Sequence, residues 1–151
     1  MAKTSPVTAT VRSGPNPAGY SGTPLAKKLG VKDGQLTWWL KMPATVAAEI
    51  AQSGVQPKLV KTPKAGLEMA HVFVTRKAEL AEHLGWLRGV LAQDGIVWVS
   101  WPKKASGMTT DVTEDVVREV CLPLGLVDVK VCAVDATWSG LKLVIRKSER
   151  T

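Results

Sequence analysis

The sequence has few of the side chains on which metal sites, disulfide frameworks and catalytic triads depend. Its 151 residues include only two cysteines and two histidines. Cys121 and Cys132 lack the spacing of metal ligands and are too few for a disulfide framework, so we expect two free thiols in a reducing compartment. His71 and His83 have no nucleophile or metal-binding partner at a meaningful spacing. The sequence therefore predicts no metal site and identifies no catalytic residue.

Long apolar segments are also missing. No apolar run approaches the roughly 20 residues that a membrane-spanning helix requires. The first residues, MAKTSPVTATVRSG, contain no apolar core of a secretory signal. We therefore expect a cytoplasmic protein that does not contact a membrane.

Positive charge is present in excess. The 20 lysines and arginines outnumber the 13 acidic residues, which gives a formal net charge of +7 at pH 7. This excess favours an anionic partner, which is a nucleic acid, a phosphorylated metabolite or an acidic protein. Charge alone does not choose among the three.

The order of apolar patterns predicts one α/β domain. Residues 1–19 are rich in Ser, Thr, Pro, Gly and Ala and predict a disordered tail, the domain spans 20–147, and 148–151 form a second tail. Strands alternating with helices imply a three-layer, Rossmann-like domain with a mostly parallel sheet and helices on both faces. The last two strands form an antiparallel hairpin through ATWS, with its turn at Trp138-Ser139-Gly140. The expected strands are 36–42, 57–62, 69–75, 95–102, 127–135 and 140–147, and the expected helices are a short one ending at Gly30, then 43–54, 76–93 and 111–125.

Polar residues mark the starts of the two longer helices. Thr75 is the expected N-cap of the helix over 76–93. Asp111 with Glu114 fits an acidic capping box at the start of the helix over 111–125, and Thr110 is the alternative N-cap. These side chains would occupy the first-turn N–H groups, so we interpret Thr109 to Asp115 as a cap rather than a binding loop.

Four stretches resemble, in order, a small family of uncharacterised bacterial proteins grouped as a domain of unknown function. They are GYSGTPLAKKLG, WPKKASG, TDVTEDVVREV and CAVDATWSGLKLVIRK. The resemblance spans roughly residues 19–147. It implies a small bacterial cytosolic protein and brings no established activity.

A second resemblance, to class I methyltransferases, concerns the fold. It rests on the leader LAKKLGVKDG before the first strand, on the strand over 95–102 and on the closing hairpin over 127–147. The resemblance implies a parallel sheet into which the closing strand inserts antiparallel. The implied strand order is 57–62, 36–42, 69–75, 95–102, 140–147, 127–135.

The sequence departs from the methyltransferase fingerprint, which is an acidic residue after strand one followed by closely spaced glycines that let the backbone approach the cofactor. The corresponding segment, LKMPATVAAE, has a lysine at the acidic position, Pro43 at the helix start and no glycine before Gly54. Thr62, Pro63 and Lys64 stand where an acidic residue would hold the ribose. We therefore expect no cofactor: neither S-adenosylmethionine nor a dinucleotide would bind in the usual way, and there is no P-loop consensus.

Basic residues follow the carboxyl ends of the expected parallel strands, where open α/β sheets bind ligands. These residues are Lys41, Lys61, Lys64, Arg76, Lys77, Lys103 and Lys104. The stretch WPKKASG adds hydroxyl and N–H groups close to a helix start, which favours an anion. The alternative is that loop lysines simply keep the protein soluble. The predicted ligand-binding residues are Lys41, Trp101, Lys103, Lys104, Ser106, Gly107 and Trp138.

Several side chains have structural interpretations. Trp101 and Trp138 fall at strand ends and would meet to stack a ring, with core packing as the alternative. His71, inside an apolar strand, is expected in the core, and His83 is expected to be exposed. Both cysteines are expected to be buried as small hydrophobic residues. A reactive thiol would need an exposed, electropositive setting, and Cys132 comes closer to this condition than Cys121.

Three functions remain open. The first is a non-catalytic or degenerate methyltransferase-like domain that binds a small anionic ligand or an acidic partner at the basic edge. The second is an enzyme of unrecognised chemistry that uses Lys103, Asp135 and Cys132, which requires these side chains to converge. The third is a regulatory protein–protein or nucleic-acid interaction module that uses the basic tail and exposed tryptophans, with Lys27 and Lys28 joining the tail in weak, non-specific contacts to nucleic acid.

Overall fold

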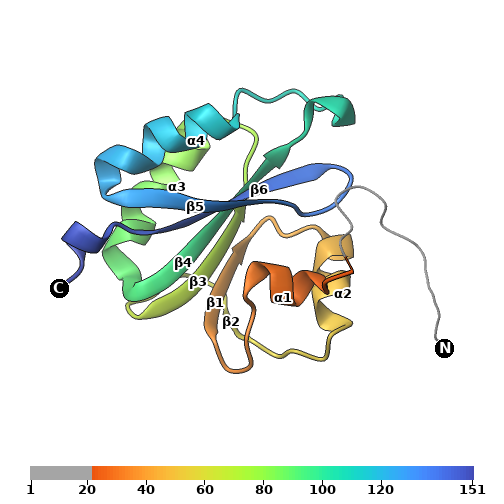
Figure 1. Cartoon of the computed structure of the whole chain (residues 1–151), viewed down its shortest axis with the longest axis horizontal. Coiled ribbons are helices and arrows are strands. Elements are labelled where there is room, and N and C mark those ends of the chain that lie inside the picture. The colour runs from red at the N-terminus through yellow and green to blue at the C-terminus, as the bar shows by residue number, and fades with distance from the viewer. Residues whose placement is uncertain (1–21) are drawn as a thin grey trace.

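The computed structural model describes residues 22–151, so the tail predicted over 1–19 lies outside the described residues. A six-stranded sheet forms the middle layer, in the order β2-β1-β3-β4-β6-β5 (Figure 1). This is the order that the sequence predicts, and the α/β fold class is confirmed. The strands are β1 Leu36–Leu40, β2 Lys58–Val60, β3 Leu67–Phe73, β4 Leu91–Pro102, β5 Leu126–Ala133 and β6 Trp138–Ile145.

The pairing of the strands explains where the two ends of the sheet lie. Strands β2, β1, β3 and β4 run parallel, so their carboxyl ends meet at one edge. Strand β6 lies antiparallel between β4 and β5, with Ser100 opposite Gly140 and Gly140 opposite Cys132. The turn between β5 and β6 therefore sits at the same edge as the carboxyl ends of the parallel strands.

Helices cover both faces of the sheet, as Figure 1 shows. Helices α3 and α4 pack on one face, where Leu84, Val117 and Leu143 belong to the larger core cluster. Helices α1 and α2 pack on the other face, in a smaller cluster around Phe73 and Trp98. The alternation of side chains along each strand supplies both clusters from the same sheet. The helices are α1 Leu25–Leu29, α2 Ala44–Ala51, α3 Lys77–Val90 and α4 Glu114–Cys121.

Several predicted element boundaries are wrong, including both ends of the helix predicted over 111–125, which spans Glu114–Cys121. The helix predicted over 76–93 ends at Val90, and β4 begins directly at Leu91 rather than at 95. The predicted hairpin turn at Trp138-Ser139-Gly140 is part of strand β6, and the turn lies before it. There the Asp135 carboxylate accepts hydrogen bonds from the N–H groups of Thr137 and Trp138, each at 2.8 Å, and so closes the turn.

The caps of α3 and α4 differ from the sequence prediction. Arg76, not Thr75, is the N-cap of α3, and its side chain makes no capping hydrogen bond. Thr113, not Thr110 or Asp111, is the N-cap of α4, and its side chain accepts from the N–H of Val116 at 3.2 Å. The Asp111 carboxylate instead accepts from the N–H of Lys77, at the first turn of α3, at 2.6 Å. Asp111 therefore joins the loop before α4 to the start of α3, a long-range contact that a local capping pattern does not reveal.

His71 lies in the core, as predicted, and forms a polar pair there. Its Nε2 atom is 2.8 Å from Ser100 Oγ, both residues are buried, and its ring stacks on Phe73 at 4.4 Å. Burial lowers the pKa of His71 to about 3. The prediction that His83 is exposed is wrong, because its ring is half-buried between Trp38 and Trp86.

Candidate anion-binding site

Lys41 ends β1 in a left-handed backbone conformation, with φ of 55°. Its ammonium group lies 2.5 Å from the carboxylate of Glu79, which belongs to the first turn of α3. The side chain thus turns toward the α3 face and makes an exposed ion pair. Lys77 makes a second such pair with Glu119 of α4. These two lysines of the predicted edge are therefore partly neutralised by carboxylates.

The segment after β1 leaves little access for a ligand to the backbone. Pro43 is the N-cap residue of α2 and has no N–H to donate. Trp39 and Met42, on either side of Lys41, pack against the core cluster beneath α1 and α2. The residues that follow β1 thus do not fit S-adenosylmethionine as the glycine-rich fingerprint holds it, in agreement with their sequence.

The predicted binding stretch WPKKASG forms a compact loop that uses its own polar groups. Ser106 Oγ donates to the carbonyl of Lys103 at 2.7 Å and accepts from the N–H of Met108 at 3.2 Å. Gly107 takes a left-handed conformation, and its N–H bonds to Lys104. Ser106 and Gly107 therefore shape the loop, whereas the ammonium groups of Lys103 and Lys104 make no ion pair within residues 22–151.

The structure does not bring the two predicted stacking tryptophans together. Trp101 is buried in the core cluster beneath α3 and α4. Trp138 packs on the opposite face of the sheet, edge-on to Phe73 with ring centroids 5.1 Å apart. Because Trp138 pairs with Pro102 rather than with Trp101, the two rings point to opposite faces. Core packing accounts for both.

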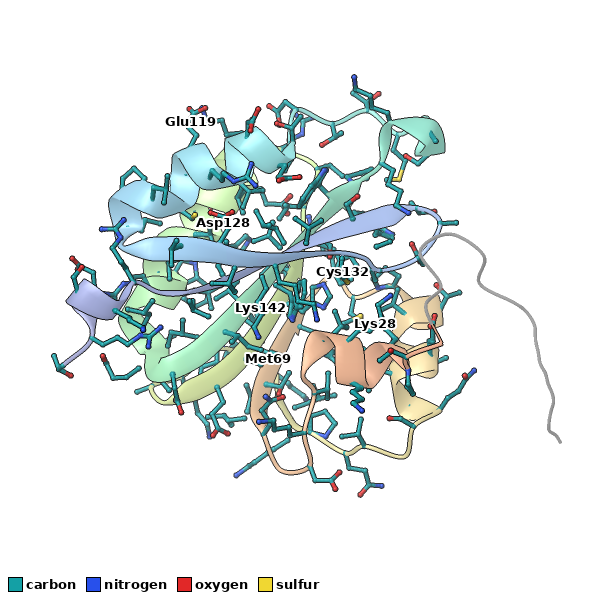
Figure 2. All side chains as sticks on the ribbon, in the orientation of Figure 1. Lys28, Met69, Glu119, Asp128, Cys132 and Lys142 are labelled. Carbon is teal, nitrogen blue, oxygen red and sulfur yellow. The ribbon has the colours of Figure 1, made fainter. Side chains whose placement is uncertain are left out.

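An open hollow of about 450 Å³ lies between α1 and β5. Its lining includes three lysines: Lys27 and Lys28 from α1, and Lys130 from β5. We call it the basic hollow, and its lining residues are Thr23, Lys27, Lys28, Lys130, Val131, Cys132 and Ala133. Lys28 and Cys132 lie on neighbouring elements in Figure 2. Segments about a hundred residues apart in the sequence thus place three ammonium groups around one opening.

Further charged groups surround the basic hollow. Lys28 donates to the carbonyl of Ala133 at 3.4 Å. Burial raises the pKa of Glu49 on α2, and the negative charge of Asp135 raises it further. The positive charge of Lys28 acts in the other direction and lowers this pKa. The charge of Lys28 therefore acts on the Glu49 carboxylate, while its ammonium group bonds to the lining of the hollow. Lys27 and Lys130 make no ion pair within residues 22–151, so their charge faces solvent.

Cys132 contributes its thiol to the lining without being reactive. Burial raises the pKa of the thiol above its ordinary value, and Lys28, Lys130 and Lys103 together only oppose that rise. The thiol is therefore protonated near neutral pH, when it is a poor nucleophile. The Asp135 carboxylate is engaged in the hairpin turn. Lys103, Asp135 and Cys132 lie in one region of the molecule. They do not form a nucleophile–base pair, because the thiol is protonated and the carboxylate is bonded to the turn.

The sequence does not predict the basic hollow. It indicates Lys27 and Lys28 only as a weak nucleic-acid contact, and Lys130 is not singled out by any pattern. Lys130 lies in the alternating stretch VDVKVCA, directly opposite Lys142 on β6. Two like charges opposite each other on neighbouring strands weaken the pairing of those strands. This unusual pair sets Lys130 apart, but it is recognised only when the register of the hairpin is known.

Comparison with solved structures identifies the fold. The chain resembles a methyltransferase from Pyrococcus furiosus, with a TM-score of 0.54 and 13% identity, over 81% of this chain and 80% of that one. It also resembles magnesium protoporphyrin IX methyltransferase from Synechocystis PCC 6803, a structure with bound S-adenosylmethionine, with a TM-score of 0.53 and 10% identity, over 81% and 74%. The likeness shows the fold alone.

A third similar structure is an enzyme described by its pericyclic reaction. The TM-score is 0.52 at 13% identity, and the match covers 81% of this chain but 39% of that enzyme, so the chain spans about two fifths of its length. No protein-family model matches the sequence, and no curated protein matches it significantly. The resemblance to a bacterial family of unknown function therefore stays a prediction. The methyltransferase-like fold, in contrast, is shared with several solved structures.

Within residues 22–151, no three His, Cys, Asp or Glu side chains come together in a group that could hold a metal ion. In the same part of the chain, every helix is too short or too polar to cross a bilayer.

Proposed function

We propose that this chain is a degenerate, non-catalytic methyltransferase-like domain that binds a small anionic ligand in the basic hollow. The observation that carries the proposal is the convergence of Lys27, Lys28 and Lys130 on one opening. Clustered ammonium groups raise the local concentration of anions and hold them by charge-assisted hydrogen bonds. A phosphorylated metabolite matches this chemistry.

The scaffold supports a binding role over a transfer reaction. The β1 end carries Lys41 and Pro43 in place of the fingerprint that would hold S-adenosylmethionine. The thiol of Cys132 stays protonated, and Asp135 is committed to its turn. No reaction step is therefore assigned to these residues.

The loop at the end of β4 widens the proposed site. Lys103 donates its backbone N–H to the carbonyl of Thr137 at 2.8 Å, which fixes it beside the β5–β6 turn. Its charge acts on the Cys132 thiol in the lining of the basic hollow. Of the sequence-predicted ligand residues, Lys103 is thus the one whose charge reaches the hollow, and we include it as a peripheral contact.

A thermal-shift screen of the full chain tests this proposal, with inorganic phosphate, pyrophosphate and nucleoside phosphates as probes. We expect at least one of these anions to raise Tm, because a ligand that binds only the folded state stabilises it. The variant Lys27→Gln/Lys130→Gln should lose this shift, and Lys103→Ala/Lys104→Ala should reduce it. No shift with any of the anions, or an unchanged shift in the first variant, would overturn the proposal.

A further inference from the structure

The solvent-facing side of α3 has features that nothing within the described chain explains. Leu80, Leu84 and Leu87 face the core, so the opposite side of the helix carries Gly85, Trp86 and Gly89. A Cβ atom built on either glycine would meet no atom within 4 Å, and neither glycine has a positive φ. An alanine would therefore fit at both positions without strain.

Each glycine weakens the helix. In a helix interior, glycine is less favourable than alanine by about 1 kcal/mol. Gly85 and Gly89 lie one turn apart on the same face, and together they form a shallow track along the helix. A track of this kind allows a second backbone or a large side chain to approach closely.

Trp86 stands beside this track and is 42% exposed. Its ring lies 5.7 Å from that of Trp38 and 6.1 Å from that of His83, so one side of the indole is packed and the other faces solvent. The Nδ1 atom of His83 is buried without a hydrogen-bond partner within the described residues. Exposed tryptophans are typical of the centres of protein interfaces.

Charged groups near the exposed side of α3 could complement each other between two copies. The N-terminal half of this side carries the exposed Glu82, whereas Glu79, one turn earlier, is paired with Lys41. The loop after β2 follows the helix, since Trp38 Nε1 donates to the Lys61 carbonyl and the Gly66 N–H donates to the Val90 carbonyl at the C-terminal end. Lys61 and Lys64 of this loop, both exposed and without an ion pair in the described chain, thus flank the C-terminal half.

We propose that a second copy of this chain docks on the exposed side of α3, forming a two-fold symmetric dimer in which Trp86 of each copy lies over Gly85 and Gly89 of the other. A two-fold interface brings the same surface of both copies together, and antiparallel helices bring Glu82 of one copy next to the loop after β2 of the other. Glu82 then meets Lys61 and Lys64 of the second copy. The large ring and the glycine track complement each other in shape.

Sedimentation of the full chain over a range of concentrations tests the proposal. We expect reversible association to twice the 16.2 kDa mass. The variant Gly85→Gln fills the track and should raise the dimer Kd by about tenfold or more. Its monomer should be at least as stable as the wild type, because glutamine is a better helix former than glycine. The matched control Ala48→Gln, at an exposed position of α2, should dimerise like the wild type.

Charge reversal tests the relative orientation of the copies. Glu82→Lys should weaken the dimer, and combining it with Lys64→Glu should restore association. A wild-type chain that stays monomeric at all concentrations would overturn the proposal. A dimer that Gly85→Gln leaves intact would also overturn it, because the two copies would then meet on another surface.

Discussion

The paired His71 and Ser100 illustrate how one buried residue ties stability to pH. The His71 ring is 1% exposed, and burial holds its pKa near 3, far below the ordinary 6.5. Between these two values the unfolded chain binds a proton at this position and the folded chain does not. The free energy of unfolding therefore falls as pH falls through this window.

We predict that His71 contributes a slope of about 1.4 kcal/mol per pH unit to the free energy of unfolding between about pH 4 and pH 6. Urea unfolding across this range measures the slope. The variant His71→Leu/Ser100→Ala removes the titrating ring and its partner together, and its slope should be shallower. Equal slopes in the two proteins would show that His71 is not held neutral by the fold.

Gly140 is the second residue whose role the structure makes testable. A Cβ atom at this position would lie 3.1 Å from Val134 Cγ2 and 3.3 Å from Trp98 Cε3. Both neighbours are buried, and the Trp98 ring is held by its Nε1–H bond to the Leu29 carbonyl at 2.7 Å. The glycine on β6 therefore lets Val134, after β5, and Trp98 of β4 pack closely against this strand.

Gly140→Ala should lower the free energy of unfolding by about 1–3 kcal/mol, because the added methyl group overpacks a fixed core. Denaturant unfolding measures the change. Ser139→Ala, at the neighbouring position of β6, adds no atom and serves as the control. A Gly140→Ala protein as stable as the wild type would mean that Val134 and Trp98 move aside without cost.

Among the secondary-structure elements, α3 and α4 depend on one loop for their starts. Thr113 caps α4, while Asp111, only two residues earlier, bonds to the first turn of α3. Thr110 Oγ1 adds a bond to the Thr75 carbonyl at 2.7 Å, just before α3. The loop thus holds two helices that lie next to each other on the same face of the sheet.

Hydrogen exchange should separate the two caps. Thr113→Ala should lower the protection of amides in the first turn of α4, and Asp111→Ala should lower it in the first turn of α3, each at a cost of about 1 kcal/mol. The pattern predicted from sequence, in which Asp111 caps α4, requires the opposite assignment for Asp111. Loss of protection in α4 on Asp111→Ala would therefore contradict the structure.

This loop also shows what the sequence could and could not predict. The positions of the strands followed from their apolar runs, and their order in the sheet followed from the resemblance to class I methyltransferases. The caps did not follow, since the partner of Asp111 is Lys77, 34 residues away. For the same reason the sequence did not predict the basic hollow, because Lys130 joins Lys27 and Lys28 only once β5 is folded beside α1.

For the molecule as a whole, two proposed binding surfaces lie on a fold that is shared with solved methyltransferases. The six-stranded sheet follows the order of methyltransferase-like folds, and solved methyltransferases match it over most of the chain. The proposed anion site lies on β5, which is one of the two outermost strands of the sheet, and the proposed dimer surface lies on α3. Strand β2 is the other outermost strand, so substitutions near it serve as controls for the proposed anion site.

Calorimetric titration of the full chain with pyrophosphate tests the anion site most directly. We predict that Lys27→Gln/Lys130→Gln raises Kd by about tenfold or more, because it removes two of the charges that line the basic hollow. The control Lys58→Gln/Lys64→Gln removes the same charge near the β2 edge and should change Kd by less than about twofold. Equal losses in both variants would mean that overall charge attracts the anion, and an absence of binding in the wild type would contradict the proposed function itself.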